Sequence, residues 1–378
     1  MRDKKGEDME NLKKWKAWAI ISTCLLVLVS LLYVTSLSNK NQEKEVQPEE
    51  IVEPVSEEVS WLSLWKEDAE AKVFLEEYMK DITDENSANF IPVENRIAVF
   101  DLDGTLFCET DPVYFDHMLF MHRVLEDPDH EASEFELQVA EKVQEFIDTG
   151  SYPSGLDNLH GQGVASAFAG MTVREFYDYV KAYGQTASPG YNNMNRGDAF
   201  YLPMIEIIEF LQENEFKTYI VSGTDRLIVR GALEGLSFLH IPANQIIGSD
   251  ELLTTVNKGD KDGLDYTFTS EDELILAGEF QIKNLKMNKV TVIAQEIGIQ
   301  PVLAFGNSSG DFAMANYTLT NNPYRSMAFM LCCDDTLREN GNETKAESMR
   351  KSCAENGYIA ISMKDDWTTI YGDEVTRK

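Results

Sequence analysis

The sequence predicts an α/β protein in which a Rossmann-like parallel sheet carries an inserted, mainly helical cap and follows one transmembrane helix. Three short apolar runs are each followed at once by small or polar residues, and they span 97–100, 218–221 and 302–305. Patterns typical of amphipathic helices, LPMIEIIEFLQENEF and VTVIAQEIG, lie between these runs. Short apolar strands that alternate with amphipathic helices indicate a parallel sheet with both faces covered.

The first expected element is an apolar segment at 17–37, which holds 21 positions without a charged residue. About 20 apolar residues are enough to cross the hydrocarbon of a membrane. Basic residues precede the segment and glutamates follow it, so residues 1–16 are expected in the cytoplasm and the rest of the chain outside, at the cell surface. A cleaved signal peptide is the alternative, but the basic region is long and no A-x-A-like site follows, so we expect an uncleaved anchor.

Residues 38–60 are polar, acidic and proline-bearing, a composition that cannot bury a core and is typical of a stalk. Apolar residues recur with helical spacing from Trp61 to Met79, which predicts a helix before the first strand. The folded part is therefore expected to begin near Trp61.

More than a hundred residues separate the first two predicted strands, far more than one crossover helix needs. Residues 108–198 contain helical patterns, FELQVAEKVQEFI and TVREFYDYVKAYG, and breaks rich in glycine, proline and asparagine. We interpret 108–198 as a helical cap, inserted into a catalytic core made of 61–107 and 199–378.

A second insertion, roughly 250–280, alternates apolar and polar residues around DKDG and is predicted to form a hairpin. Asp260, Asp262 and Asp265 resemble a calcium loop only faintly, because their spacing misses the EF-hand pattern. We expect a turn there.

The overall charge argues against a nucleic-acid partner. The chain of 378 residues carries 65 acidic and 33 basic residues, a formal net charge of −32. Nucleic-acid backbones attract basic surfaces. With 43% apolar residues, the chain can still bury a full core.

Cysteine and histidine residues show no spacing typical of a zinc site. Cys353 could form a disulfide with Cys332 or Cys333; alternatively these cysteines and Cys108 are buried thiols, two of them in the apolar run SMAFMLCC. The histidines are expected to satisfy local hydrogen bonds, and they are His117, His122, His130, His160 and His240.

The run IAVFDLDGTLF ends an apolar strand in two aspartates, Asp101 and Asp103. Two neighbouring carboxylates raise each other's pKa and lose hydration, so a positive group is expected between them. Asn307 and Asp311 follow the third predicted strand, and the carboxyl ends of parallel strands meet at one edge of a sheet. Oxygen ligands without thiolate or imidazole suit Mg²⁺, which would also attract an anionic substrate.

These residues resemble the four motifs of the haloacid dehalogenase superfamily. The matching positions are DLDGT at 101–105, Ser222 in IVSGT, a lysine before the last helix, and GNSSGD at 306–311. The resemblance covers roughly 61–378. A cap between the first two motifs, together with GNSSGD, is most similar to the phosphoserine phosphatase and phosphorylcholine phosphatase branch.

The resemblance implies a role for each motif residue. Asp101 would be the nucleophile that forms an aspartyl-phosphate. Asp103 would protonate the leaving oxygen and then deprotonate the hydrolytic water. Ser222 and the Gly223 backbone N–H would bind a phosphoryl oxygen, and a lysine would neutralise charge on the nucleophile and the transferring group.

Three lysines precede the final strand–helix unit, namely Lys283, Lys286 and Lys289. We favour Lys289, because it opens the predicted helix VTVIAQEIG, as the lysine of the family commonly does.

The same resemblance implies the metal ligands. They are a carboxylate oxygen of Asp101, the backbone carbonyl of Asp103 and the Asn307 side chain, with Asp311 nearby or bound through water. The commoner family pattern is GDxxxD, so Asn307 removes one formal charge while keeping an oxygen ligand.

The substrate class follows from two acidic residues. A general acid at Asp103 is the phosphatase and mutase arrangement, whereas dehalogenation does not need it. Glu109 lies near the position where phosphoserine phosphatases carry a glutamate that binds the substrate's ammonium, with a spacing shorter by one residue. We expect a small phosphomonoester with an amine, of the phosphoserine, phosphoethanolamine or phosphorylcholine type.

Two other functions are considered. A mutase or phosphotransferase would need a second phosphate site in the cap, for which Arg174 and Arg196 are candidates. A catalytically silent, membrane-tethered binding protein would use the cleft without chemistry.

Overall fold

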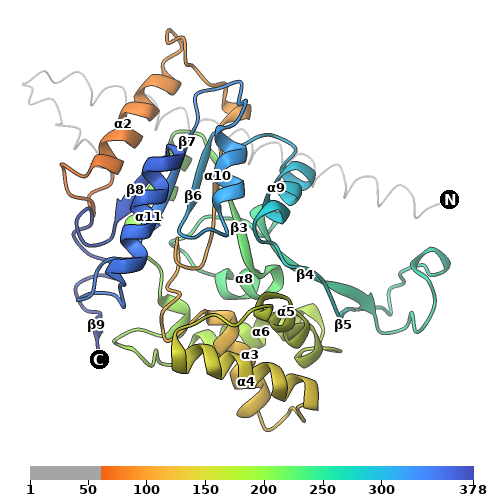
Figure 1. Ribbon diagram of the computed structural model, residues 1–378. Helices are drawn as coiled ribbons and strands as arrows, with labels where there is room; N and C mark the ends of the chain where they lie inside the picture. The colour runs from red at the N-terminus through yellow and green to blue at the C-terminus, as the bar shows by residue number, and fades with distance from the viewer. Residues whose placement is uncertain (1–60) are drawn as a thin grey trace, which may run out of the picture. The chain divides into compact units, whose positions relative to one another are not determined.

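The three predicted strands lie side by side at the centre of a seven-stranded sheet in the computed structural model, which describes residues 61–378 (Figure 1). The strand order is β5-β4-β3-β1-β6-β7-β8, and every neighbouring pair is parallel except β4 and β5. The strands are β1 Ile97–Phe100, β3 Lys217–Asp225, β4 Ile246–Thr255, β5 Leu274–Ile282, β6 Leu303–Gly306, β7 Met327–Cys332 and β8 Ile359–Ser362. The predicted mostly parallel α/β sheet is confirmed.

An aromatic ladder aligns the central strands. The rings of Phe100 and Phe305 stack with centroids 4.4 Å apart, and those of Phe305 and Phe329 stack at 4.8 Å. These residues are also partners in the strand register. The Asp101 backbone N–H donates to the Phe305 carbonyl at 2.9 Å, so the polar residues that follow β1 and β6 begin at the same level.

Helices cover both faces of the sheet, as the sequence predicts. The apolar side chains of α2 and α7 pack in one core with Phe100 and Ile220. Those of α9, α10 and α11 pack in a second core with Val99 and Val221 on the other face. The helices are α2 Glu70–Thr83, α7 Leu202–Glu213, α8 Arg226–Leu233, α9 Met287–Val292, which continues as a π-helical turn Ile293–Ile297, α10 Phe312–Leu319 and α11 Glu343–Asn356.

The first helix starts later than predicted, at Glu70 rather than at Trp61. Tertiary contacts override the helical spacing of the preceding residues. The Trp65 indole N–H donates to the Pro203 carbonyl at 3.0 Å, and its ring packs edge-on against Trp367. Leu62 has φ +59°, which a continuous helix excludes.

Four helices lie together at the lower edge of Figure 1, and we call them the cap helices. They share a hydrophobic cluster that includes Phe120, Phe168 and Phe176. Ser133 and Thr172 begin two of them with capping boxes. The cap helices are α3 Phe115–Leu125, α4 Glu134–Thr149, α5 Leu156–Ala167 and α6 Val173–Gly184. The domain boundaries at 107/108 and 198/199 stay a prediction.

The predicted hairpin is confirmed, because β4 and β5 pair in antiparallel fashion. It extends away from the sheet (Figure 1) and also contacts the cap helices. Leu276 of β5 is buried in the cap cluster, its N–H donates to the Met171 carbonyl, and its carbonyl accepts from the Gly170 N–H, both at 2.9 Å.

A short ribbon joins the C-terminus to the segment that follows the cap helices. Strand β9, Thr376–Arg377, pairs antiparallel with β2, Tyr191–Asn192. The Lys378 N–H donates to the Gly190 carbonyl at 2.8 Å. Short 3₁₀ helices span Val93–Asn95, Arg196–Asp198, Ala243–Gln245 and Gly263–Asp265.

The expected cytoplasmic segment 1–16, transmembrane helix 17–37 and stalk 38–60 lie outside the described residues. Within 61–378, none of the helices is both long and apolar enough to cross a membrane. The cysteines of this part are free thiols, and Cys332 is buried in β7. Cys108 and Cys353 are buried as well, whereas Cys333 follows β7 and is half-buried, so the thiol alternative is observed, with three of the four thiols buried.

Candidate active site

The loop after β1 places two carboxylates at the edge of the sheet. Asp101 and Asp103 are both at least nine-tenths buried. Gly104 reverses the chain between them and Phe107 with φ +77°, and its N–H donates to the Phe107 carbonyl at 2.6 Å. A Cβ at Gly104 would lie 1.9 Å from the side-chain nitrogen of Asn307, so the loop needs glycine for space as well as for conformation.

Lys289 of α9 bridges two of the predicted acids. Its Nζ lies 2.5 Å from Oδ1 of Asp101 and 2.7 Å from Oδ1 of Asp311, and the lysine is fully buried. Burial lowers the pKa of Lys289, but the two carboxylates outweigh it and the net pKa is raised, so the ammonium is kept charged. Lys283 and Lys286, the alternative candidates, instead line the cavity in front of this cluster.

The turn after β6 fixes Asp311 and Asn307. Oδ2 of Asp311 accepts hydrogen bonds from the backbone N–H groups of Asn307 and Ser308, both at 3.1 Å. A Cβ at Gly306 would lie 2.5 Å from the Asp311 Cβ, so glycine permits this close return. The Asn307 side-chain nitrogen donates to Oε1 of Glu109 at 3.1 Å, which turns the amide oxygen away from Glu109.

The end of β3 contributes a third group of polar atoms. Gly223 and Thr224 line the cavity, and the Thr224 hydroxyl donates to Oδ2 of Asp103 at 2.7 Å. Ser222 is fully buried, and its hydroxyl accepts from the Thr224 N–H at 3.0 Å. The side-chain nitrogen of Asn284 donates to the Ser222 carbonyl at 2.9 Å, which helps to fix the position of this strand end.

Burial dominates the electrostatics of the acids. It raises the pKa of Asp101 to about 7; the charge of Asp311 adds to the rise and Lys289 opposes it. It raises the pKa of Asp103 well above its usual range, with a further contribution from Asp116. It also raises the pKa of Glu109 to about 8. Carboxylates outnumber the lysines Lys283, Lys286 and Lys289 at this site, so a further positive charge would be stabilised there.

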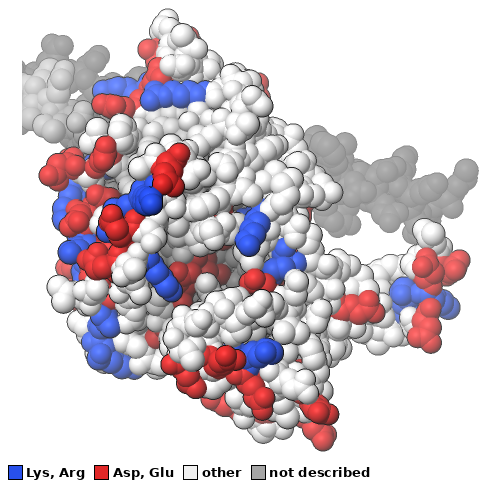
Figure 2. Space-filling model, viewed as in Figure 1, with Lys and Arg blue, Asp and Glu red and all other residues white. Residues whose placement is uncertain are grey.

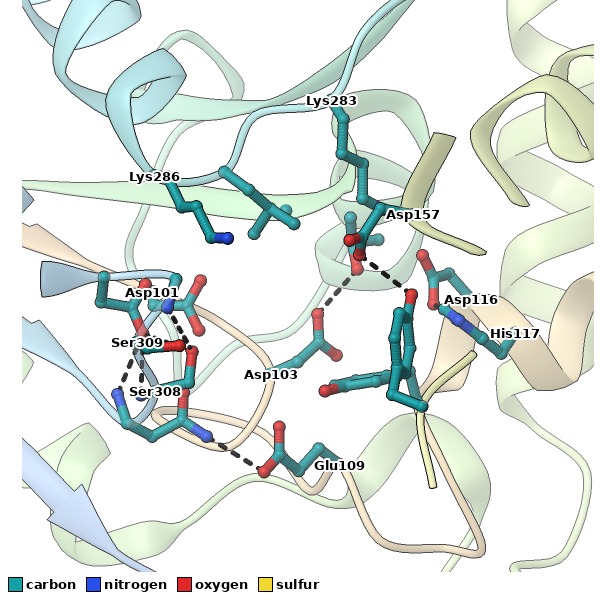
Figure 3. Close-up of a pocket in the computed structure, with 18 residues that line it drawn as sticks. Asp101, Asp103, Glu109, Asp116, His117, Asp157, Lys283, Lys286, Ser308 and Ser309 are labelled. Atoms are coloured by element: carbon teal, nitrogen blue, oxygen red, sulfur yellow. Dashed lines mark hydrogen bonds and ion pairs between the residues drawn. The ribbon is translucent and has the colours of Figure 1, made fainter. Parts of the chain in front are cut away.

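These groups open into a cavity of about 310 Å³. Figure 3 shows Asp101 and Ser308 on one side, Asp103 between, and Asp116, His117 and Asp157 on the opposite side. The opposite wall comes from the cap helices and the residues that join them. Its side chains are Tyr114, Asp116, His117, Tyr152 and Asp157.

Most predicted site residues meet at this cavity. Ser222 and Lys289 lie just behind its wall and contact residues that line it. The predicted residues among those that line it are Asp101, Asp103, Glu109, Gly223, Asn307 and Asp311. The catalytic and ligand roles assigned to all of them stay predictions.

Sequence reasoning missed Thr224 and the wall formed by the cap helices. Thr224 could have been found, because it follows Ser222 and Gly223 at a strand end. The cap residues carry no motif, so their position depends on how α3 and α5 pack.

Four of the five histidines divide into two pairs. His122 and His130 make local contacts to Glu126 and Glu136, both at 2.9 Å, as expected. His117 and His160 instead stack with ring centroids 3.8 Å apart beside Asp116, and the ligand atoms of these three residues lie within 4.8 Å of one another. Sequence spacing gave no sign of this cluster, because α3 and α5 bring it together.

Comparison with known proteins matches the chain to one family model. The family model of haloacid dehalogenase-like hydrolases matches residues 98–316. Among curated proteins, none matches the sequence significantly.

Several solved structures are similar to the chain at low identity. A conserved protein of unknown function from Anaerococcus prevotii DSM 20548 has 16% identity and a TM-score of 0.47 over 79% of this chain and 94% of that chain. Cytosolic 5'-nucleotidase IIIB bound to cytidine has 14% identity and a TM-score of 0.46 over 79% and 88%. A phosphoserine phosphohydrolase-like protein from Francisella tularensis subsp. tularensis SCHU S4 has 12% identity and a TM-score of 0.38 over 70% and 94%.

Proposed function

The chain belongs to the haloacid dehalogenase-like hydrolase family, whose model matches residues 98–316, and from this premise we propose that it hydrolyses phosphomonoesters with the help of Mg²⁺. The observation that carries the proposal is the buried bridge from Lys289 to Asp101 and Asp311 at the floor of the cavity. A carboxylate paired with a fixed ammonium is suited to attack an anionic phosphoryl group, because the cation offsets charge repulsion.

The proposed reaction has two steps. A carboxylate oxygen of Asp101 attacks phosphorus and forms an aspartyl-phosphate, while Asp103 gives its proton to the leaving alkoxide. Asp103 then takes a proton from water, which attacks phosphorus and releases inorganic phosphate and the Asp101 carboxylate. The hydrogen bond from Thr224 fixes one oxygen of Asp103 during both proton transfers. The Gly223 N–H and Ser222 would bind a phosphoryl oxygen.

The donor set fits Mg²⁺, which takes oxygen ligands. The candidate ligands are Asp101, the Asp103 carbonyl and the Asn307 amide oxygen. The Asn307 amide nitrogen donates to Glu109, so its oxygen points away from Glu109. Asp311 accepts from Lys289 and from two backbone N–H groups, which suits an indirect role. When bound, the ion would supply positive charge that neutralises the phosphate and the nucleophile.

The narrower proposal is a small substrate with an amine. The cavity size of about 310 Å³ and the acidic wall of Asp116 and Asp157 support it. Glu109 is the residue for which the family resemblance implies a contact with the ammonium. We include in this proposal that the chain is similar to the phosphoserine phosphatase or phosphorylcholine phosphatase branch of the family.

The mutase alternative has weaker support. Arg174 pairs with Glu234 and Asp178 on the surface, and Arg196 lies over the ring of Tyr183. Within the described residues, neither arginine lines the cavity. The silent binding alternative is weakened by the ordered ion-pair cluster around Asp101.

The test is turnover of p-nitrophenyl phosphate by the purified full chain, with Mg²⁺ and after its removal by a chelator. Asp101→Asn should abolish turnover, because an amide cannot form the acyl-phosphate, and should leave thermal unfolding close to that of the unmodified chain. Activity near normal in Asp101→Asn would exclude the mechanism, and full activity after chelation would exclude the metal requirement.

A further inference from the structure

The opening of the catalytic cavity carries three lysines, which we call the rim lysines, namely Lys283, Lys286 and Lys345. Lys283 and Lys286 line the cavity itself. Lys345 lines a second cavity of about 600 Å³, which adjoins the first because Glu109 and Asn307 line both. Figure 3 shows Lys283 and Lys286 on one side of the catalytic cavity and Glu109 on the other. The rim lysines therefore lie on two sides of one opening.

The backbone of Lys286 is held in a conformation that favours glycine. Its φ is +54°, and its N–H donates to the Gly310 carbonyl at 2.9 Å. Non-glycine residues in such strained conformations cluster at functional sites, where the surrounding structure holds them. Figure 3 shows the Lys286 amino group directed into the cavity, whereas Lys289, three residues later, lies in the buried contact with Asp101. This segment thus places one lysine at the opening and one at the floor.

The charges of the rim lysines are available to an incoming anion. Lys283 is half-buried, and Lys286 and Lys345 are exposed. The ion pairs between lysines and carboxylates within residues 61–378 all involve other lysines. The rim still acts on the cavity, because burial raises the pKa of Glu109 to about 8 and the charge of Lys345 is among the influences that oppose this rise.

An anionic substrate meets repulsion before it reaches the floor of the cavity, because the full sequence carries a net charge of −32. Six carboxyl groups also line the catalytic cavity, and they belong to Asp101, Asp103, Glu109, Asp116, Asp157 and Asp311. Figure 2 shows basic side chains on either side of a hollow that has acidic side chains inside it. Positive charge at the opening offsets the repulsion at the place where a phosphate enters.

We propose that the rim lysines attract the phosphate dianion of the substrate and guide it into the catalytic cavity, without contacting the phosphoryl group during its transfer. The ligand class is a doubly charged phosphomonoester or inorganic phosphate. This inference rests on the proposed phosphomonoesterase function for the identity of the substrate. It assigns the entry of the anion to the rim lysines and leaves the stabilisation of the transition state to Lys289.

The position of Lys289 explains this division. Its Nζ lies 2.5 Å from Asp101 and the lysine is fully buried, so the nucleophile has a cation of its own. Exposed charges, by contrast, act through water over about 10 Å at 0.1 M salt and about 30 Å at 0.01 M. The contribution of the rim lysines should therefore depend strongly on salt, whereas that of Lys289 should not.

The test is the salt dependence of kcat/KM for p-nitrophenyl phosphate, measured on the full chain at one Mg²⁺ concentration between about 0.01 and 0.3 M NaCl. In the unmodified chain, kcat/KM should fall as salt rises, because salt screens an attraction. Lys283→Gln/Lys286→Gln should lower kcat/KM about tenfold at the lowest salt. Its kcat/KM should then stay level or rise with salt, because mainly repulsion remains to be screened, and kcat should stay within about twofold. Lys283→Arg/Lys286→Arg keeps the charge and should keep the normal slope.

Two matched controls carry the same changes of net charge. Lys258→Gln/Lys261→Gln removes two lysines between β4 and β5, outside the lining of both cavities. Lys351→Gln removes one exposed lysine from α11, the helix that also carries Lys345. Both controls should keep the salt dependence of the unmodified chain, whereas Lys345→Gln should reduce it.

Calorimetric binding of inorganic phosphate gives a second measurement that needs no turnover. The dissociation constant should rise with salt in the unmodified chain and should lose most of this dependence in Lys283→Gln/Lys286→Gln. If the chain hydrolyses no phosphomonoester but binds phosphate in this way, the proposed function falls and the role of the rim lysines stands. If it neither hydrolyses esters nor binds phosphate, both fall.

Three results would overturn the inference and leave the phosphatase proposal in place. The first is an unchanged salt dependence in Lys283→Gln/Lys286→Gln. The second is an equal change in Lys258→Gln/Lys261→Gln, which would assign the effect to net charge and not to the rim. The third is a fall in kcat of about tenfold or more with the salt dependence retained, which would show that a rim lysine contacts the reacting group.

Discussion

At the residue scale, Gly104 shows how closely the catalytic loop fits its neighbours. Its φ is +77°, and an added Cβ would meet Asn307 at 1.9 Å and Glu109 at 2.6 Å. We expect Gly104→Ala to lose most of its phosphatase activity, because Asn307 or the loop must move. Steady-state turnover of p-nitrophenyl phosphate and thermal unfolding measure the two effects.

Gly150→Ala is the control for this change. Gly150 also has a left-handed φ, +66°, but nothing lies within 4 Å of its would-be Cβ. It should cost about 1–2 kcal/mol of unfolding free energy for the backbone alone and leave activity intact. Equal losses of activity in the two variants would contradict the claim that space beside Asn307 matters.

Asp103 offers a direct view of the proposed intermediate. Asp103→Asn removes the proton donor and the base, so kcat should fall by at least about a hundredfold. The Asp101 nucleophile is left in place with its contact to Lys289. With an activated ester whose leaving group needs no acid, phosphoenzyme should accumulate and be visible by mass spectrometry of the denatured protein. Normal turnover in this variant would assign the proton transfers to another group.

The site residues that could be predicted from the sequence were predicted for one physical reason, their position at the ends of strands. Asp101 and Asn307 directly follow β1 and β6, and Ser222 lies near the carboxyl end of β3. Parallel strands end at one edge of the sheet, so the convergence of these residues follows from the fold. Asp116 and His160 lie on two cap helices, α3 and α5. Their proximity depends on how these two helices pack, and the hydrophobic periodicity of the sequence does not predict that packing.

At the element scale, most predicted elements match the structure closely and the first helix does not. The patterns FELQVAEKVQEFI, TVREFYDYVKAYG and LPMIEIIEFLQENEF begin within one residue of α4, α6 and α7. The first strand, 97–100, matches β1, because a short buried run bounded by polar residues has few alternatives. The predicted 218–221 is only part of β3, Lys217–Asp225, whose polar end continues beside β4. The residues before Glu70 do not form a helix, because Trp65 instead donates to the Pro203 carbonyl and packs against Trp367.

The C-terminal ribbon is the element that ties the segment after the cap helices to the core. The Arg377 guanidinium donates to the carbonyls of Thr336 and Glu339 and to the side chain of Asn340. Arg377→Ala should therefore lower the unfolding free energy by about 1–3 kcal/mol, since several hydrogen bonds to a charged group are lost together. Limited proteolysis should also cut faster between residues 185 and 198, which the ribbon holds.

Lys351→Ala provides the comparison for Arg377. Lys351 lies exposed on α11 and pairs with Glu355 at 3.8 Å, so its loss should change stability by at most about 1 kcal/mol. If both variants unfold at the same temperature and are cut at the same rate, the ribbon does not hold this segment.

At the scale of the whole molecule, charge is distributed unevenly. Figure 2 shows charged side chains gathered at the left edge, over the cap helices at the lower edge and at the tip of the β4–β5 extension, with fewer charged side chains on the surface between them. Acidic residues exceed basic ones by 32 over the full sequence. Such a field repels highly anionic molecules such as nucleoside triphosphates, which agrees with a small phosphomonoester whose amine offsets part of the phosphate charge.

The membrane topology remains a proposal from the sequence, since residues 1–60 lie outside the described part. The uncharged segment 17–37 with its basic upstream flank should hold residues 61–378 on the outer side of the membrane. Protease added to intact cells should then digest a C-terminal epitope while a cytoplasmic marker stays whole. Reversing the flank with Lys13→Glu, Lys14→Glu and Lys16→Glu should reduce this digestion, because lysines on the cytoplasmic side set the orientation. An epitope that is protected in the unmodified chain would contradict the orientation, and a soluble form that begins near residue 40 would contradict the uncleaved anchor.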